Sequence, residues 1–450
     1  MSYAVRQGPL PRGNSTLRPW KVAERRLWAA GLRDEIGIMR RVPSILATLT
    51  VALSVLLPAQ AALASFTDVP SSYWDATAIN YVAVTHPWMA DFGPGTFEPT
   101  ANEIRKYLAR TLVKVYAPTV VPNTNITFTD LPATDPFYRF AVVATQLGWM
   151  PKYSSGRWDP NGPIRSEGFD RALVLALGLK PVADSLAHIH MDDGTPFAVN
   201  MWMPYLQIAR AATLHYNHTT ESMDLEPGRV IHRDEVAYSL YRAKTIGSWN
   251  FTNQSRYLNI SLPTLDSSHA NIKALITYAL AQIGLPYIWG GEWGAGPSPV
   301  PYCCGTQTQA GLDCSGFIWW TVKQAEQGYL AASYHPAYPG WSVLDRTSTG
   351  MALHTTKPVA FAYLHPGDLM FFVSAGTAKT ASNVNHVGLY VGNGWMIHSS
   401  SYNAGVLIDW VGSGYYRDNF VFGRHLTTSG SSGAASHADT VTNLNGGDAV

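Results

Sequence analysis

Three degenerate repeats between residues 66 and 246 constrain the fold of this 450-residue chain more than any other feature. Each copy reads as an acidic opening turn, an apolar helical stretch, a loop that ends in an x-Pro turn, and a second helix that starts near an arginine. The three arginines are Arg105, Arg165 and Arg233. One such pair of short helices cannot bury a core alone, whereas stacked copies can. We therefore predict an all-α bundle of three repeats over residues 65–247.

The order of motifs in these repeats resembles the S-layer homology (SLH) family. The first two copies open on F-x-D, and an x-R-x-E helix start recurs in varied form. The resemblance implies a three-pronged helical bundle whose grooves hold a secondary cell-wall polysaccharide, often an acidic or pyruvylated glycan. It would place Arg105, Arg165 and Arg233 at ligand-facing helix starts, where a guanidinium pairs with a carboxylate in fork geometry. The alternative is that these arginines brace the bundle.

A targeting signal precedes the repeats. Basic residues at 40–41 are followed by an uncharged apolar run at 45–57 and by small-x-small sequences at 59–64. The run of about 13 residues is shorter than the roughly 20 that span a bilayer, which favours a cleaved signal over a membrane anchor. We expect a secreted chain that starts near Ser65 and keeps no transmembrane segment. Residues 1–38 exceed an ordinary signal n-region, so translation is expected to start at Met39.

Composition excludes some classes of protein. Lys and Arg number 32 against 31 Asp and Glu, so the chain has no electrostatic footprint of a nucleic-acid binder. Three cysteines, Cys303, Cys304 and Cys314, are too few for a disulfide framework. No clustered ligand set with metal spacing is visible, so neither a metal nor an organic cofactor is expected.

Cys314 lies where a helix is predicted to begin, within Asp313-Cys314-Ser315-Gly316-Phe317. The positive end of a helix dipole lowers the pKa of a thiol, as a nucleophile requires. A buried structural cysteine is the alternative, since that is the commonest fate of a free cysteine. An unpaired thiol in an exported protein, with a glycine two residues later, favours the nucleophile.

His386 and His398 lie on the two strands of a predicted hairpin. A three-residue turn at 392–394 places His398 opposite Gly388, so the histidines share one face about 7 Å apart at the backbone. A two-residue turn would put them on opposite faces. Only the first arrangement lets one imidazole orient another, as a general base with a tautomer-fixing partner requires. We therefore predict Cys314 as nucleophile, His386 as base and His398 as the orienting group.

Five segments resemble the NlpC/P60 peptidase family, in the order of that family. They are P-Y-x-W-G-G from Pro286, D-C-S-G-F from Asp313, P-G-D-L-x-F-F from Pro366, N-H-V-G-L-Y from Asn385 and I-H-S from Ile397. The resemblance implies an α+β papain-like NlpC/P60 catalytic domain over residues 269–426. It also implies a cysteine-type endopeptidase, a hydrolase that cleaves the γ-D-Glu to diamino acid bond of peptidoglycan stem peptides through an acyl-enzyme.

The same resemblance assigns four substrate-binding residues around the thiol. Asp313 and Ser315 would receive a free stem-peptide amine, Tyr287 would lie near the thiolate, and Arg346 would line the mouth of the site. An insertion at 292–312 departs from the family pattern and carries Cys303-Cys304, either as a strained disulfide or as two thiols.

The predicted organisation is therefore an anchor joined to a hydrolase. A polar linker is expected at 248–268 and a disordered Ser/Gly/Ala-rich tail at 427–450. Docking of the repeats on a wall glycan would raise the local concentration of peptidoglycan. An N-acetylmuramoyl amidase or acyltransferase on the same scaffold is one alternative. A structural wall protein with an inactive catalytic domain is another, against which the Cys-His-His set argues.

Overall fold

A computed structural model describes residues 66–90, 92–218, 224–291, 309–323, 337–343 and 345–426, with the backbone alone at 296–297 and 306–307. The expected signal region, the Cys303-Cys304 pair and the expected tail lie outside these residues. Within the described ranges, no helix combines the length and the apolar character needed to cross a bilayer.

The N-terminal part is helical, as the repeats predict. Its elements are α1 (Ala76–Ile79), the π-helical η1 (Asn80–Thr85), α2 (Arg105–Tyr116), α3 (Tyr138–Gln146), α4 (Ser166–Ala176), α5 (Lys180–Leu186), α6 (Met203–Ala211) and α7 (Arg233–Thr245), with a short strand β1 (His190–Met191) before α6. Helices α2 and α7 begin at Arg105 and Arg233, and α4 begins directly after Arg165.

Backbone hydrogen bonds close the three copies into a ring. The N–H of Ile164 donates to Glu103 O at 3.0 Å, that of Ile231 to Ile164 O at 2.9 Å, and that of Glu103 to Ile231 O at 2.9 Å. Each residue lies just before the second helix of its copy. Extended backbone at these positions therefore satisfies its polar groups across copies, which ties the repeats together.

The opening aspartates explain the F-x-D motif. Asp68 accepts hydrogen bonds from the backbone N–H of Phe97 and Glu98, about thirty residues later in the same copy. Asp130 does the same for Trp158 and Asp159 in the second copy. The carboxylate thus fixes the loop that carries a buried aromatic ring into the helical core. The third copy instead uses Gln309, whose side chain bonds Glu226 N and Asp224 O.

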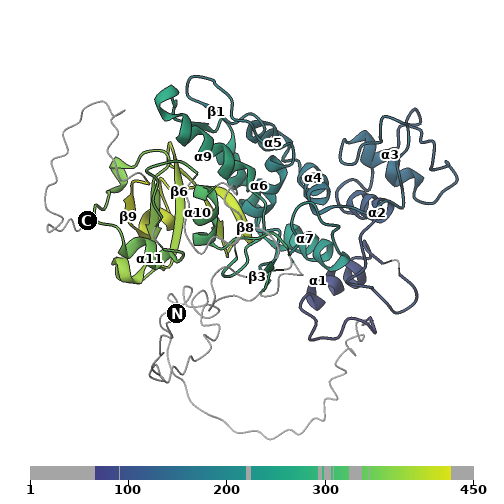
Figure 1. The fold of residues 1–450 in the computed structure, drawn as a ribbon. Coiled ribbons are helices and arrows are strands. Elements are labelled where there is room, and N and C mark those ends of the chain that lie inside the picture. Colours follow the sequence, from purple (N-terminus) through teal and green to yellow (C-terminus); the bar gives the residue numbers. More distant parts are fainter. Residues whose placement is uncertain are drawn as a thin grey trace, which may run out of the picture. The chain divides into compact units, whose positions relative to one another are not determined.

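The C-terminal part is built on a five-stranded antiparallel sheet of order β8-β7-β6-β5-β9. The strands are β5 (Leu369–Phe372), β6 (His386–Gly392), β7 (Trp395–Ser400), β8 (Gly405–Trp410) and β9 (Phe420–Arg424). Its helices are α9 (Ala270–Ala281), α10 (Cys314–Lys323), α11 (Ser348–Leu353) and α12 (Tyr415–Asn419), and the short strands β3 (Gly296–Pro297) and β4 (Thr306–Gln307) pair apart from the sheet. Helix α10 packs against β6 and β7, and Figure 1 shows it beside β6; this gives the expected mixture of helix and sheet.

Residues 248–268, expected to be a linker, are folded. They form α8 (Trp249–Thr252), the 3-10 helix η2 (Asn253–Tyr257), β2 (Ser261–Leu262), which pairs with β1, and the 3-10 helix η3 (Ser267–His269). Tyr257 is fully buried and its hydroxyl donates to Ile408 O in β8. This stretch is polar in composition, which led to the linker prediction. Its few apolar residues, Tyr257, Ile260 and Leu262, are buried and hold it against the rest of the fold.

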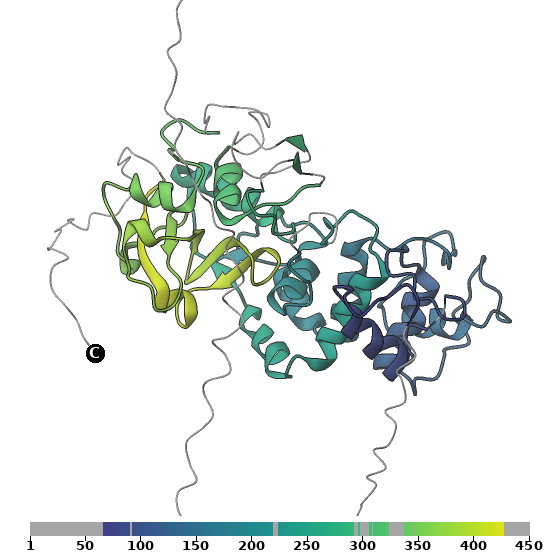
Figure 2. The ribbon, with the colours of Figure 1, turned by 90° about the horizontal axis from the view of Figure 1, so that it is seen from below.

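One hydrophobic core joins the last helical copy to the sheet. Buried side chains of α5 and α6, such as Leu186 and Ile208, belong to the same cluster as Leu280 of α9 and Leu407 of β8. Helix α6 lies against β8. Seen from below in Figure 2, teal helices lie next to the green and yellow sheet. The third copy therefore forms part of the support of the sheet.

Candidate active site

Cys314 is the first residue of α10, as predicted, and only 8% of its surface is exposed. The backbone N–H groups of Val387 and Ser315 act to lower the pKa of its thiol, against the larger effect of burial. Val387 directly follows His386 in β6, so the packing of α10 on β6 brings the thiol beside the predicted base.

Gly316 permits this close approach. A Cβ atom at this position would lie 2.1 Å from Gly291 O and 2.7 Å from an Nη atom of Arg346. Any larger residue would push the start of α10 away from the 286–291 segment. The glycine of D-C-S-G is thus required by sterics.

The hairpin brings the two histidines together. Tyr390 pairs with Met396, which is the register that places His398 opposite Gly388. The Nε2 atom of His386 lies 2.8 Å from Nδ1 of His398. The prediction that both rings share one face is therefore confirmed.

The turn of this hairpin was predicted wrongly. Gly392 pairs with Trp395, so the turn has two residues, Asn393 and Gly394, and the register shifts between Tyr390 and Gly392. A β-bulge takes up one residue there and restores the alternation that a two-residue turn alone would invert.

His398 is fully buried in β7. No described residue bonds its Nε2 atom. The ring packs edge-to-face on Tyr416, with centroids 5.0 Å apart, and Tyr416 also lies 6.0 Å from His386. Tyr416 could not be recognised from the sequence, because nothing around it distinguishes it from the other tyrosines among the 23 of the chain.

The electrostatic state of the site differs from the expectation for Cys314. Burial, followed by the nearby charge of Asp313, raises the pKa of the Cys314 thiol to about 12. Burial lowers the pKa of His386 to about 4, and burial together with His386 lowers the pKa of His398 well below its usual value. The expected lowering by the helix start is therefore wrong for the resting site. Desolvation outweighs the two N–H donors and Arg346, so the thiol and both imidazoles are neutral.

Arg346 gathers the remaining predicted residues. Its Nη1 atom donates to Asp313 Oδ1 at 3.0 Å and to Ser315 Oγ at 2.9 Å. Its Nη2 atom donates to the carbonyls of Gly290 and Gly291 at 3.1 and 2.9 Å. The guanidinium thus joins the start of α10 to the 287–291 segment by hydrogen bonds.

Tyr287 lies at the other end of that segment. Its backbone N–H donates to Ala404 O at 3.0 Å. Burial and the neighbouring Cys314 raise the pKa of its phenol. Asp313, Ser315, Tyr287 and Arg346 are therefore all brought close to the thiol.

The repeat arginines contact the loops of neighbouring copies. Arg105 donates to Trp158 O at 2.7 Å and to Pro151 O at 2.9 Å, with its guanidinium 4.7 Å from the Trp158 ring centre. Arg233 is buried, donates to Phe97 O and Met89 O at 3.0 Å, and forms an ion pair with Glu103 at 3.5 Å. These contacts agree with the bracing interpretation.

Arg165 differs from the other two arginines. It is exposed and donates to one carbonyl, Gly228 O, at 2.9 Å. Of the three, it alone presents its guanidinium mainly to solvent.

The C-terminal domain can be assigned to a class by comparison with known proteins. Residues 284–425 match the model of the NlpC/P60 family, so this part of the chain is an NlpC/P60 domain, as its motifs predicted. The match does not include the repeats, and their SLH identity remains a prediction.

The curated relatives are peptidases. A probable endopeptidase of Mycobacterium bovis is 32% identical over 143 residues, which are 32% of this chain and 27% of that protein. The probable peptidoglycan endopeptidase LytE of Bacillus subtilis is 31% identical over 152 residues, which are 34% of this chain and 33% of that protein. The chain thus spans about a quarter to a third of the length of these relatives. Among solved structures, RipD of Mycobacterium tuberculosis, described as a non-catalytic NlpC/p60 domain protein, is 21% identical with a TM-score of 0.24, over 34% of this chain and 96% of that one.

Proposed function

We propose that this chain is a secreted cysteine endopeptidase that hydrolyses the γ-D-Glu to diamino acid bond of peptidoglycan stem peptides. The observation that carries the proposal is the position of Cys314 at the start of α10, which packs on the strand β6 that carries His386, together with the 2.8 Å pair of His386 and His398. The nucleophile Cys314, the base His386 and the orienting group His398 are then arranged in series, as covalent catalysis requires. The endopeptidase relatives support the class of substrate.

The tautomers follow from the pair. If His386 donates its Nε2–H to Nδ1 of His398, the Nδ1 atom of His386 carries the lone pair that receives the thiol proton. His398 then holds its own proton at Nε2. Because the resting thiol and imidazole are neutral, proton transfer to His386 accompanies attack of sulfur on the amide carbon. The imidazolium next protonates the leaving amine, and water hydrolyses the thioester.

The charges beside Cys314 suit a substrate with a free amine. Asp313 Oδ1 already accepts from Gly316 N, Ser315 Oγ and Arg346. No described residue bonds the second oxygen, Oδ2, which we assign to the ammonium group of the stem peptide. Arg346 and Ser315 hold the carboxylate in place for that contact.

The helical repeats supply the proposed attachment to the wall. Arg165, exposed just before α4, is assigned to a carboxylate of a secondary cell-wall polysaccharide, while Arg105 and Arg233 brace the ring. Pelleting of the Cys314→Ala chain with purified walls tests this part. Arg165→Ala should weaken pelleting, and Arg139→Ala, an exposed arginine that also bonds a single carbonyl, should not.

Mass spectrometry of fragments released from purified peptidoglycan tests the reaction. The full chain should release peptides with a new diamino-acid N-terminus, and Cys314→Ala should release none. Stem peptides cut intact from the glycan would identify an amidase instead. Failure of the unsubstituted chain to release any fragment would favour a structural wall protein.

A further inference from the structure

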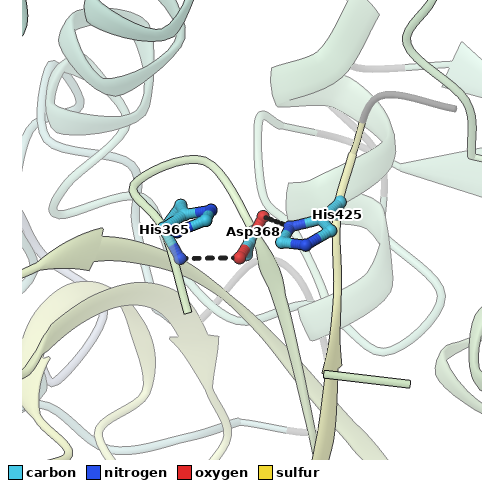
Figure 3. A group of neighbouring side chains, drawn as sticks. All are labelled: His365, Asp368 and His425. Carbon is cyan, nitrogen blue, oxygen red and sulfur yellow. Dashed lines mark hydrogen bonds and ion pairs between the residues drawn. The ribbon is translucent and has the colours of Figure 1, made fainter. Parts of the chain in front are cut away.

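Three side chains gather at the edge of the sheet, away from the catalytic residues. Asp368 directly precedes β5, His365 lies three residues before it, and His425 directly follows β9. Leu369 pairs with Arg424, so the adjoining residues Asp368 and His425 face each other across the two strands. One donor atom from each of the three residues lies within 4.8 Å of the other two. Figure 3 shows the carboxylate between the two imidazoles.

The carboxylate of this cluster is held in place. Asp368 is buried, and its Oδ2 atom accepts from the backbone N–H of His365 at 2.7 Å. Its Oδ1 atom lies 2.8 Å from Nδ1 of His425. The backbone of Asp368 is fixed as well, because its carbonyl accepts from Tyr390 N at 2.8 Å.

The two histidines, in contrast, are exposed and lie parallel. Their ring centroids are 5.3 Å apart and the planes differ by 11°. The χ2 torsion of an imidazole is broad, so small changes of ring orientation cost little even at His425, whose Nδ1 atom already contacts Asp368. An ion could therefore enter from solvent and meet a fixed carboxylate with two adjustable nitrogen ligands.

We propose that His365, Asp368 and His425 form a binding site for a divalent transition metal, with zinc as the best fit and water completing the coordination. Two imidazoles and one carboxylate are a ligand set that zinc accepts. Tetrahedral ligands at about 2.0 Å from zinc lie roughly 3.3 Å apart. The Asp368–His425 pair must open slightly and His365 must close, which the exposed rings permit.

A metal at this site would stabilise the sheet and would take no part in the peptidase reaction. His386 pairs with Phe372, at the far end of β5 from Asp368, four residues or about 13 Å along the strand. A metal at Asp368 would cross-link the start of β5 to the end of β9, the edge strand that closes the sheet. The sequence predicted no metal because it shows no clustered ligand set, and His425 lies 57 residues beyond Asp368.

Cobalt titration of the full chain in a Cys314→Ala background tests the site, since removal of that thiol excludes it as a ligand. Visible d–d absorption should report one bound Co²⁺ per chain, and Zn²⁺ should displace it. His365→Ala and His425→Ala should each weaken binding at least tenfold. His354→Ala, an exposed histidine of the same domain that bonds only the carbonyl of Gly350, should leave binding unchanged.

The melting temperature gives an independent readout, because a metal that binds only the folded state raises it. Zn²⁺ should raise the melting temperature of the Cys314→Ala chain and of His354→Ala, but not of His365→Ala or His425→Ala. Absence of binding would overturn the proposal. So would binding that survives in both cluster variants, or that disappears in His386→Ala, which would place the ion at the catalytic pair. None of these results depends on peptidase activity, so this proposal can fail while the proposed function stands.

Discussion

The Nε2 atom of His386 lies 2.8 Å from Nδ1 of His398, and His398 is the fully buried member of the pair. A buried imidazole that bonds a second one fixes the orientation of its ring and its tautomer. His386 is the less buried of the two and is the one assigned as base. Mutation of each histidine in turn should therefore distinguish their roles.

We predict that His386→Ala lowers kcat by about 10²–10⁴-fold, the usual contribution of a general base. His398→Ala should lower kcat less, since it removes orientation and leaves the base. KM should change little in either variant, because neither ring is assigned to substrate binding. Steady-state kinetics on a defined stem peptide measures both parameters. Equal losses in the two variants would contradict the assignment of separate roles.

The pH dependence should reflect the neutral resting pair. With the pKa of His386 near 4, kcat/KM should fall only below about pH 4 and not near the ordinary histidine value of about 6.5. With the pKa of Cys314 raised to about 12, alkylation by iodoacetamide should be slow at pH 7 and rise about tenfold per pH unit up to pH 10. Rapid alkylation below neutral pH would show instead a resting thiolate–imidazolium pair.

Gly388 allows the histidine pair to form. A Cβ atom there would lie 2.6 Å from Met396 Sδ and 3.3 Å from His398 Cβ, in a closely packed part of the sheet. Gly388→Ala should therefore cost about 1–3 kcal/mol of stability and reduce kcat. Gly168→Ala is the control, since a Cβ atom in α4 would meet nothing within 4 Å. That change should be neutral or stabilise by up to about 1 kcal/mol in urea unfolding. A Gly388→Ala chain with wild-type stability and kcat would contradict the packing argument.

Much of the site could be predicted from sequence because its determinants are local. The alternation of residues around His386 and His398 set their common face, and the motif around Cys314 set the start of α10. The bulge between Tyr390 and Gly392 could not be predicted, because the extra residue has no signature in composition. The raised pKa of Cys314 could not either, since burial depends on strands that follow it by seventy residues or more.

Contacts between distant segments account for what else was missed. Residues 248–268 look polar, yet Tyr257 is held by β8, about 150 residues later. The ring formed by Glu103, Ile164 and Ile231 depends on all three copies at once. His425 meets Asp368 only because β9 lies beside β5.

Asp75 should make the helical part less stable at alkaline pH. Burial, followed by the charge of Asp234, raises the pKa of Asp75 to about 9, and no described residue bonds its Oδ2 atom. An acid with a raised pKa binds more protons when folded, so its penalty is absent below about pH 4 and grows as pH rises toward about 9. Asp75→Asn should therefore raise the melting temperature, and by more at pH 8 than at pH 5. Asp184→Asn, an exposed control in α5, should show no gain that grows with pH. An equal gain for Asp75→Asn at both pH values would contradict the linkage.

Arg210 connects the third helical copy to the sheet domain. It is buried in α6, forms an ion pair with Asp224 at 2.7 Å, and donates to the carbonyls of Ala404 and Gly284. Arg210→Ala would leave the Asp224 carboxylate in the interior without its main partner, a change that typically costs about 3–5 kcal/mol.

Because the third helical copy and the sheet share one hydrophobic core, this loss should destabilise both together. Urea unfolding followed by tryptophan fluorescence and by circular dichroism should show one transition, moved to lower urea by the same amount with either probe. Arg165→Ala, the exposed arginine, should change stability by less than about 0.5 kcal/mol. Two separate transitions, of which Arg210→Ala moves only one, would show that the helical and sheet parts are independent. The repeats could then be tested for wall binding as an isolated fragment, whereas a single transition requires that every binding experiment use the whole chain.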